Sequence, residues 1–381
     1  MRTSSFWDEP RFVRPWLSSI DLQLTGGSTR DARSSSGKRT HLASLYGFED
    51  VSALSAASPD FPLTLKGAPE HICLQAVADM FEVDLNIYQN FCWGFFLHFH
   101  LPAIVLRIYP TGFLEDARCH FRSRKNHRSI YEKPLDPLAP FLRHHDISIN
   151  RIDQPGLSDS TLFLGWSYSY EDTCYLDFID MTFKTGILFP TGKKKNVRLL
   201  FDIPYGYNGH WGIPVSGQIT FGAYDWLSWG LYAEALFFKD KKRCLRMKTE
   251  HEVDCGFIVL GQGDAFVQQG TLWKAASYIK ADHFFNGLSI LLGISYEQKN
   301  RDHITPCNIE LFKSSLVNND PHFFKWQRSI FHFQADYDFA HENSVVGTRL
   351  AIFYNHEIWG TRVLSINTTG GYLGIDLSWC F

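Results

Sequence analysis

The stretch Gln327-Arg-Ser-Ile-Phe-His-Phe-Gln-Ala-Asp-Tyr-Asp-Phe339 decides the fold, because its residues alternate between two kinds. Every second side chain is small or apolar: Ser329, Phe331, Phe333, Ala335, Tyr337 and Phe339. The positions between them are Arg328, Ile330, His332, Gln334, Asp336 and Asp338. Successive side chains of a β-strand point to opposite faces of the sheet. The stretch therefore predicts a strand with one apolar face and one mostly charged or polar face.

Twelve segments of this kind run along the chain. They lie near residues 15–25, 80–90, 94–106, 161–171, 174–188, 211–223, 226–239, 271–283, 287–298, 327–339, 344–357 and 370–381. Each is close to or above the roughly 9–11 residues that a tilted strand needs to cross a bilayer. In eleven of the twelve, the more apolar phase carries no Asp, Glu, Lys or Arg. The exception is 174–188, where the apolar phase changes after Phe178, so we expect a β-bulge there.

The links between these segments alternate between short and long. The short links are Asn90–Gly94, Glu171–Thr173, Tyr224–Asp225, His283–Gly287 and Ala340–Asn343. The long links are 26–79, 107–160, 189–210, 240–270, 299–326 and 358–369. This alternation predicts a meander barrel with short periplasmic turns and long extracellular loops, of which 26–79 and 107–160 are the longest. Within the first of these loops, the spacing of Ile72, Ala76, Val77 and Met80 predicts a short helix at Ala68–Met80.

The cost of burying charge separates a membrane barrel from a large soluble β protein. A Lys or Arg on the lipid face costs roughly 2–4 kcal/mol at the middle of a bilayer. A soluble sandwich has a polar outward phase and a dry, apolar inward phase. Here one phase is too charged for a dry core, and the other is too apolar for a surface in water. We therefore expect an all-β fold: a transmembrane antiparallel β-barrel of about 12 strands, with 1–381 as a single domain.

Composition and the N-terminus bear on location and partners. A net charge of −3 does not indicate a nucleic-acid partner, and no apolar run approaches the roughly 20 residues of a membrane helix. We expect the outer membrane of the Gram-negative cell envelope, with its lipid as a partner. Met1–Arg14 has no apolar segment typical of a signal peptide. Either the true reading frame begins upstream, or the chain is a mature form, or the barrel interpretation is wrong.

The end of the chain carries the first resemblance to a known group. Gly371-Tyr-Leu-Gly-Ile-Asp-Leu-Ser-Trp-Cys-Phe381 resembles the C-terminal strand of bacterial outer-membrane proteins, porins among them. In that group a terminal Phe preceded by alternating apolar residues is recognised by the barrel-assembly machinery. The resemblance implies that this machinery is a partner and that the assembly signal consists of Phe381, Trp379, Leu377, Ile375 and Leu373.

A second resemblance covers under a tenth of the chain. Gly156-Leu-Ser-Asp159, two strands joined by a short turn, and then Phe189-Pro-Thr-Gly192 are similar to outer-membrane transporters linked to phenol meta-pathway degradation. Those proteins are related to fatty-acid transporters. The resemblance implies a carrier of hydrophobic molecules.

Charged residues on the less apolar phase are expected to line the barrel interior. They are Arg328, His332, Asp336, Asp338, Arg349, Asp376, Glu234, Lys274 and Lys280. Arg349 follows Asp336 and Asp338 by one strand and precedes Asp376 by one, so these charges can pair across strands and brace the wall. They can also form a constriction that filters ions.

Basic residues gather just beyond the strands that run toward the long loops. They are Arg107, Lys193, Lys194, Lys195, Lys241, Lys242 and Arg243. A ring of cations at one rim suits the phosphates of lipopolysaccharide. The alternative is that long loops simply contain more residues of every kind.

Metal, cofactor and enzyme hypotheses receive little support from the sequence. His98 and His100 share one strand face, but no third ligand has the required spacing. No Ser–His pair lies on an apolar phase and no phosphate-binding glycine loop is present, so we expect neither an enzyme nor a cofactor. Of the eight cysteines, Cys244 and Cys255 are the nearest candidate disulfide, with free thiols as the alternative.

Together these patterns predict a porin-like channel or transporter that passes small solutes through a polar lumen. Two alternatives remain. One is a structural or surface-interaction barrel with a plugged lumen, and the other is a carrier of hydrophobic compounds.

Overall fold

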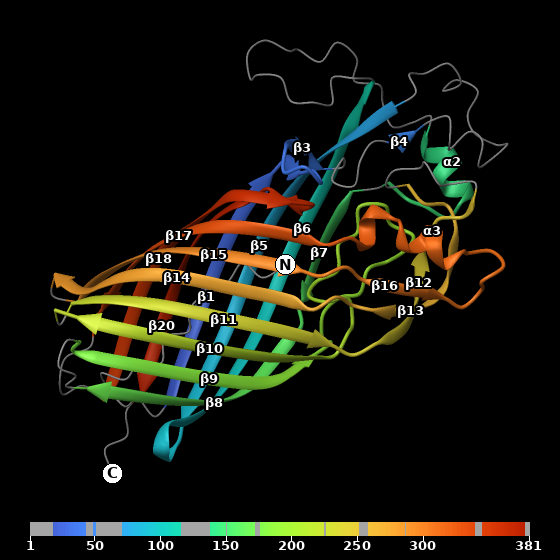
Figure 1. The fold of residues 1–381 in the computed structure, drawn as a ribbon. Helices are drawn as coiled ribbons and strands as arrows, with labels where there is room; N and C mark the ends of the chain where they lie inside the picture. Colours follow the sequence, from blue (N-terminus) through green and yellow to red (C-terminus); the bar gives the residue numbers. More distant parts are fainter. Residues whose placement is uncertain are drawn as a thin grey trace, which may run out of the picture.

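The computed structural model describes residues 18–42, 49–50, 71–115, 138–149, 151–171, 176–224, 226–250, 258–285, 287–339 and 345–377. Twelve strands close into one barrel (Figure 1). They are β1 (Ser18–Thr29), β5 (His71–Asn90), β6 (Phe95–Glu115), β8 (Ser160–Glu171), β9 (Phe178–Phe189), β10 (Gly212–Ala223), β11 (Leu227–Phe238), β14 (Leu272–Phe285), β15 (Leu288–Lys299), β17 (Trp326–Asp338), β18 (Val346–Thr361) and β20 (Asn367–Leu377). Each of the twelve segments expected from the sequence corresponds to one of these strands.

The barrel is an antiparallel meander in which each strand pairs with its neighbours along the chain. Closure comes from β1, which pairs with β5 on one side and with β20, the last strand, on the other. The β1–β20 register is unbroken from Ser18, opposite Leu377, to Ser28, opposite Asn367. The ring therefore leaves no free sheet edge among its strands. The predicted fold class is confirmed.

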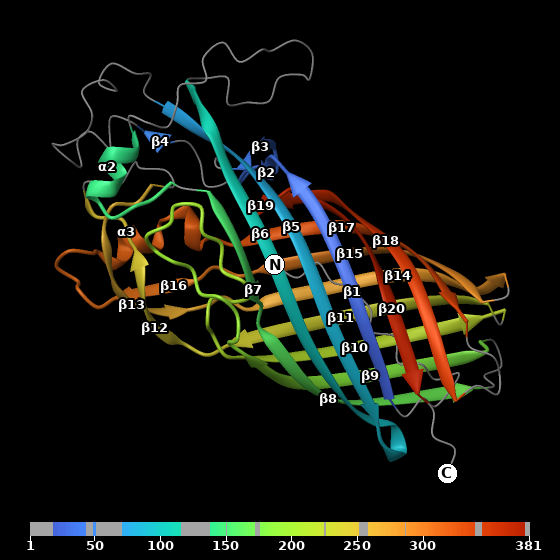
Figure 2. The same ribbon diagram turned by 180° about the vertical axis from the view of Figure 1, so that it is seen from behind.

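The remaining elements gather at the end of the barrel that carries the long links (Figures 1 and 2). Two small sheets lie there: β2 (Asp31–Arg33), β3 (Arg39–His41) and β19 (Val363–Leu364) form one, and β12 (Lys241–Arg246), β13 (Gln262–Gln268) and β16 (His303–Pro306) form the other. The others are β4 (Glu49–Asp50), β7 (Ile152–Leu157), α2 (Leu138–His144), α3 (Ser314–Asn318) and the 3-10 turn Pro321–Phe323. A second 3-10 turn, Cys92–Gly94, joins β5 to β6 at the opposite end. No helix in the described part of the chain is long and apolar enough to cross a bilayer.

The two faces of the barrel have opposite polarity. Large apolar side chains point outward and are exposed, as Ile352 (65%) and Ile294 (54%) illustrate, whereas Asp376 (0%) and Asp84 (0%) point inward. On β17 the alternation has the predicted phase, since Arg328, His332, Gln334 and Asp336 are all buried in the interior. A belt of exposed apolar side chains around a charged interior suits a surrounding of lipid tails.

Strands β5 and β6 extend beyond the other strands, which corrects the predicted loop boundaries (Figure 2). The expected loops at 26–79 and 107–160 are shorter, because β5 begins at His71 and β6 continues to Glu115. In these extensions the two faces exchange polarity: Met80 and Ile108 point inward and are buried, while Arg107 points outward. The outward phase stops being apolar where this exchange begins, so the strands predicted from that phase stop there too.

The predicted helix at Ala68–Met80 is wrong, because residues from His71 onward form the extended β5 and pair with β6. Ile72, Ala76 and Met80 are four residues apart, a spacing that satisfies the period of a strand as well as that of a helix. The pairing partner, which lies about thirty residues along the chain, decides between the two.

The predicted β-bulge in 174–188 is also wrong, since β9 keeps a continuous register with both neighbours. Phe178 instead lies on the inward face opposite Gly222, and its ring occupies the space that a side chain at Gly222 would fill. The phase break lies between β7 and β8. Relative to β6, Leu157 pairs with Ala103 but Thr161 pairs with His100, so one extra residue enters there.

Ion pairs in the interior join the strands on either side of the closure. Near the short-turn end, the Arg349 guanidinium of β18 lies 3.3 Å from Asp376 on β20 and 3.4 Å from Asp21 on β1. Ser19 on β1 donates a hydrogen bond of 2.6 Å to Asp376. Arg349 therefore contacts both strands of the β1–β20 seam.

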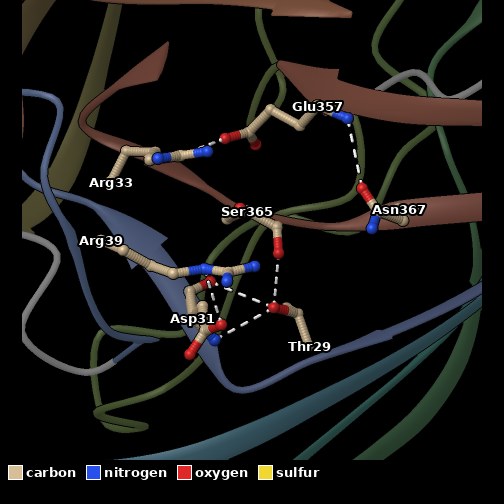
Figure 3. Close-up of polar contacts among 7 residues, drawn as sticks. All are labelled: Thr29, Asp31, Arg33, Arg39, Glu357, Ser365 and Asn367. Carbon is tan, nitrogen blue, oxygen red and sulfur yellow. Dashed lines mark hydrogen bonds and ion pairs between the residues drawn. The ribbon is translucent and has the colours of Figure 1, made fainter. Parts of the chain in front are cut away.

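At the other end of the seam, polar contacts tie the first and last long links to the barrel (Figure 3). Arg33 of β2 lies 2.9 Å from the buried carboxylate of Glu357 on β18, and Arg39 lies 2.9 Å from Asp31. The hydroxyl of Thr29 donates to the Ser365 carbonyl.

Replacing Arg349 with Met should weaken the seam. Asp376 and Asp21 would lose their buried cationic partner, and breaking such a pair costs about 3 kcal/mol. We expect this loss in the free energy of unfolding, measured by urea titration in lipid vesicles with tryptophan fluorescence. The control is Arg107→Met, which removes an exposed pair with Asp153 and should leave the transition unchanged. Equal transitions for the two variants would contradict a structural role for Arg349.

Candidate functional site

The link between β9 and β10, residues 190–211, folds into the mouth of the barrel and is called the inward loop below. Its two ends are held by one buried side chain, Asp159, at the break between β7 and β8. One carboxylate oxygen of Asp159 accepts the Gly192 N–H at 2.8 Å, and the other accepts the Tyr207 N–H at 2.5 Å. The extra residue at the β7–β8 break turns Asp159 inward, where it can reach both donors.

Two glycines allow this close approach. Gly206 has φ +83°, a conformation that side chains disfavour, and a Cβ there would also collide with the Asp159 carboxyl. A Cβ at Gly192 would collide with the Tyr205 carbonyl. The motif Gly156–Asp159 and Phe189–Gly192, noted in the sequence as a resemblance, therefore forms the anchor of the inward loop.

An apolar cluster supports the inward loop from the barrel side. Phe201 and Tyr205 are buried against the inward faces of the extended β5 and β6, which contribute Met80 and Ile108 among others. The Tyr205 hydroxyl donates a hydrogen bond of 2.5 Å to the Gln154 carbonyl on β7. The exchange of polarity on β5 and β6 thus provides a dry surface for the loop.

Arg246, at the end of β12, connects the inward loop to two other links. Its guanidinium donates to the carbonyl oxygens of Val197 (2.7 Å), Leu260 (2.8 Å), Asp146 (3.0 Å) and His145 (3.1 Å). These carbonyls belong to the inward loop, to the segment before β13 and to the two residues that follow α2. One side chain therefore holds three links in a fixed arrangement.

A cavity of about 500 Å³ lies beneath these links and continues into the barrel interior. Its upper wall includes apolar residues of the inward loop, among them Leu199, Phe201 and Ile203. Its lower wall is formed by inward side chains from seven barrel strands: Asn86, His98, His100, Lys184, Glu234, Lys274, Glu297 and Arg328. The cavity is thus apolar on the side of the loops and charged on the side of the lumen.

The charges of the lower wall form a connected network. Glu297 lies 2.6 Å from Arg328 and 3.8 Å from Lys274, so its carboxylate is shared between two cations on neighbouring strands. Glu234 lies opposite Lys274 in the β11–β14 register and accepts the Tyr232 hydroxyl at 2.6 Å. Paired charges of this kind can brace the wall while they keep the lumen polar.

The two histidines considered as metal ligands have other neighbours in the barrel wall. His98 hydrogen-bonds Asn86 at 3.1 Å and stacks between Tyr88 and Phe163. His100 lies 3.3 Å from Asp84. His144, the last residue of α2, forms an edge-to-face pair with His145, which follows it.

All nine charges expected in the lumen lie on the inward face of their strands. They fall at two levels. Glu234, Lys274 and Arg328 line the cavity, while His332 forms hydrogen bonds with Ser295 (2.7 Å) and Asn355 (2.8 Å). The level nearer the short turns holds Lys280, Asp336, Asp338, Arg349 and Asp376. Arg349 pairs with Asp376, as expected, and with Asp21.

The seven basic residues expected at the outer rim do not form one outward ring. Arg107, Lys194 and Lys242 are exposed. Lys193 pairs with Asp202 (2.9 Å), and Lys241 donates to the Gly209 carbonyl (2.8 Å). Lys195 and Arg243 line the cavity instead.

Some sequence predictions fall partly outside the described residues. Of the predicted assembly signal, Leu373, Ile375 and Leu377 lie on β20, whereas Trp379 and Phe381 lie outside the described residues. The same holds for Cys255, while Cys244 is a free thiol. The anchoring role of Asp159 was not predicted, and its only signal was the Gly156–Asp159 motif itself.

Comparison with known proteins shows a similarity in fold to a solved structure. No family model matches the chain, and no curated protein matches it. Among solved structures, an outer membrane channel from Pseudomonas putida F1 has a TM-score of 0.55 and 10% sequence identity, covering 98% of this chain and 100% of that one. This similarity extends over the whole barrel, and at that identity it shows the fold alone.

Two further structures are more distant. A Pseudomonas aeruginosa FadL homologue has a TM-score of 0.32 and 9% identity, covering 94% of this chain and 88% of that one. The Pseudomonas putida toluene transporter TodX has a TM-score of 0.34 and 9% identity, covering 97% and 91%. These scores are too low to carry an argument.

Replacing Asp159 with Asn should release the inward loop. The amide cannot accept both backbone N–H groups, and each lost charge-assisted bond costs about 1.5–3 kcal/mol. We expect trypsin to cleave the folded variant in detergent after Lys193, Lys194 or Lys195 at least about tenfold faster than the wild type. The cleavage rate is measured by mass spectrometry. Asp153→Asn, which alters an exposed carboxylate, is the control. Unchanged cleavage in Asp159→Asn would show that Asp159 does not hold the loop.

Proposed function

We propose that this chain is an outer-membrane channel that passes small solutes through the interior of its barrel. The observation that carries the proposal is the cavity of about 500 Å³ inside a closed barrel whose outer face is apolar and whose inner face is charged. An apolar outer face supports a position in lipid, and a charged inner face supports a hydrated path across it. The structural neighbour from Pseudomonas putida F1 is itself described as an outer membrane channel.

The inward loop is the proposed gate of this channel. It occupies the mouth between the cavity and the long-loop end, so passage requires it to move. Its contacts are of two kinds: the apolar cluster around Phe201 and Tyr205, and hydrogen bonds from a few groups such as Asp159 and Arg246. Because Arg246 joins three links, its loss would free all of them together.

The location and the partners follow from the same proposal. We place the barrel in the bacterial outer membrane, with the long links outside and the short turns in the periplasm. The exposed Arg107, Lys194 and Lys242 are the residues we propose for contact with lipopolysaccharide phosphates. The barrel-assembly machinery is the proposed partner of the C-terminal strand. The proposal assigns the chain no catalytic role and no nucleic-acid partner.

A barrel with a permanently plugged lumen, serving the envelope or surface contacts, is the competing function. The dry packing of the inward loop against β5 and β6 favours it, because such packing can be stable without opening. The two functions differ in whether the loop ever leaves the mouth.

Single-channel recording in planar bilayers separates them. The wild-type protein should show discrete conductance steps with a low open probability. Arg246→Gln removes several charge-assisted bonds, each about 1.5–3 kcal/mol, and should raise the open-to-closed ratio at least about tenfold. Arg198→Gln is the matched control, since the Arg198 guanidinium lies in an exposed ion pair with Asp146, and its loss should leave the ratio unchanged. Silence from both wild type and Arg246→Gln, with both barrels folded, would reject the channel and favour the plugged barrel.

A further inference from the structure

Lys195 and Arg243 are cations that the fold directs into the cavity. Lys195 belongs to the inward loop and Arg243 to β12, and both line the cavity. They converge on Asn208: the Asn208 side chain accepts the Lys195 backbone N–H at 2.9 Å, and the Asn208 carbonyl accepts the Arg243 guanidinium at 3.4 Å. Both side chains are only partly exposed.

The nearby carboxylates are engaged with other groups. Asp202 lies 2.9 Å from Lys193 and accepts the Asn196 N–H, and Asp302 lies 2.6 Å from Lys299. Asp320, the remaining acid of the cavity wall near this site, lies 2.7 Å from His322. Within the described residues, neither Lys195 nor Arg243 has a carboxylate within the 4.0 Å of an ion pair.

The local electrostatics agree with this arrangement. Burial, together with the neighbouring Arg243 guanidinium, lowers the pKa of the Lys195 ammonium. Burial lowers the pKa of the Arg243 guanidinium to about 10. Both directions mean that the charged forms lack the stabilisation that water or an anion would supply. Arg243 still carries positive charge near neutral pH.

Apolar side chains border the same site. Arg246, three residues after Arg243, holds the carbonyls of Val197 and, at 3.5 Å, Val259. The side chains of Val197, Val259 and Leu245 all line the cavity. A fully hydrated anion such as phosphate would leave this apolar wall without a partner, and a neutral hydrophobe would leave the cations without one.

We infer that the cavity binds an organic oxyanion with a compact apolar body, whose anionic group lies between Lys195 and Arg243. Carboxylates and sulfonates belong to this class. Arg provides a planar fork of donors for two oxygens, and Lys adds a point charge. The inference rests on the proposed channel function and names the solute class for which the cavity is built.

Binding can be measured by calorimetry on the full-length protein in detergent with matched probes. Cyclohexanecarboxylate has both features, acetate has only the charge, and cyclohexylmethanol has only the apolar body. The first should bind at least about tenfold more tightly than either of the others. The double substitution Lys195→Gln and Arg243→Gln should weaken cyclohexanecarboxylate binding at least about tenfold, whereas Lys194→Gln and Lys242→Gln, at exposed neighbours, should not.

A conservative pair, Lys195→Arg and Arg243→Lys, guards against a folding defect and should keep most of the affinity. Absence of binding by the wild type, equal binding of acetate, or unchanged binding in the double Gln variant would each overturn the inference. Conductance measurements on the same proteins distinguish a failure of the anion-site inference from a failure of the proposed channel function. Conduction without probe binding rejects only the anion site, whereas probe binding without conduction rejects only the channel.

Discussion

The structure depends on one constraint: inside a lipid bilayer every backbone N–H and C=O must find a partner within the protein. A sheet meets it only by closing, and here closure is the unbroken pairing of β1 with β20. Arg349 and the carboxylates around it add side-chain contacts across that seam. The even number of strands follows from this closure, because the first and last strands of the meander pair antiparallel.

Closure then determines what the two faces can be. The outward face meets lipid and is apolar, so the charges must lie inside, where they pair around Glu297 and Arg349. Beyond the lipid, β5 and β6 exchange the polarity of their faces, and the inside becomes dry. The inward loop packs on this dry surface with a charged wall below it. The cavity lies where the apolar and the charged parts of the interior meet.

The periodicity of the sequence is sufficient to predict all twelve strands, the closed meander and the inward phase of the lumen charges, because these depend on local alternation. It fails where alternation is ambiguous or reverses, as in 26–79 and 107–160, where β5 and β6 continue with exchanged faces. The cavity could not be predicted from local sequence patterns, because it depends on hydrogen bonds between Asp159 and residues more than thirty positions away. For the same reason Lys195 and Arg243 resembled rim cations in the sequence.

The most direct test of the account is a spin-label scan along β17 in lipid vesicles, with native cysteines replaced by Ser. Labels at 331, 333, 335 and 337 should be accessible to oxygen dissolved in the lipid. Labels at 330, 332, 334 and 336 should be shielded from it, which gives a period of two residues. A flat profile, or oxygen accessibility at the even positions, would mean that this strand does not separate lipid from lumen, and the barrel in lipid would be refuted.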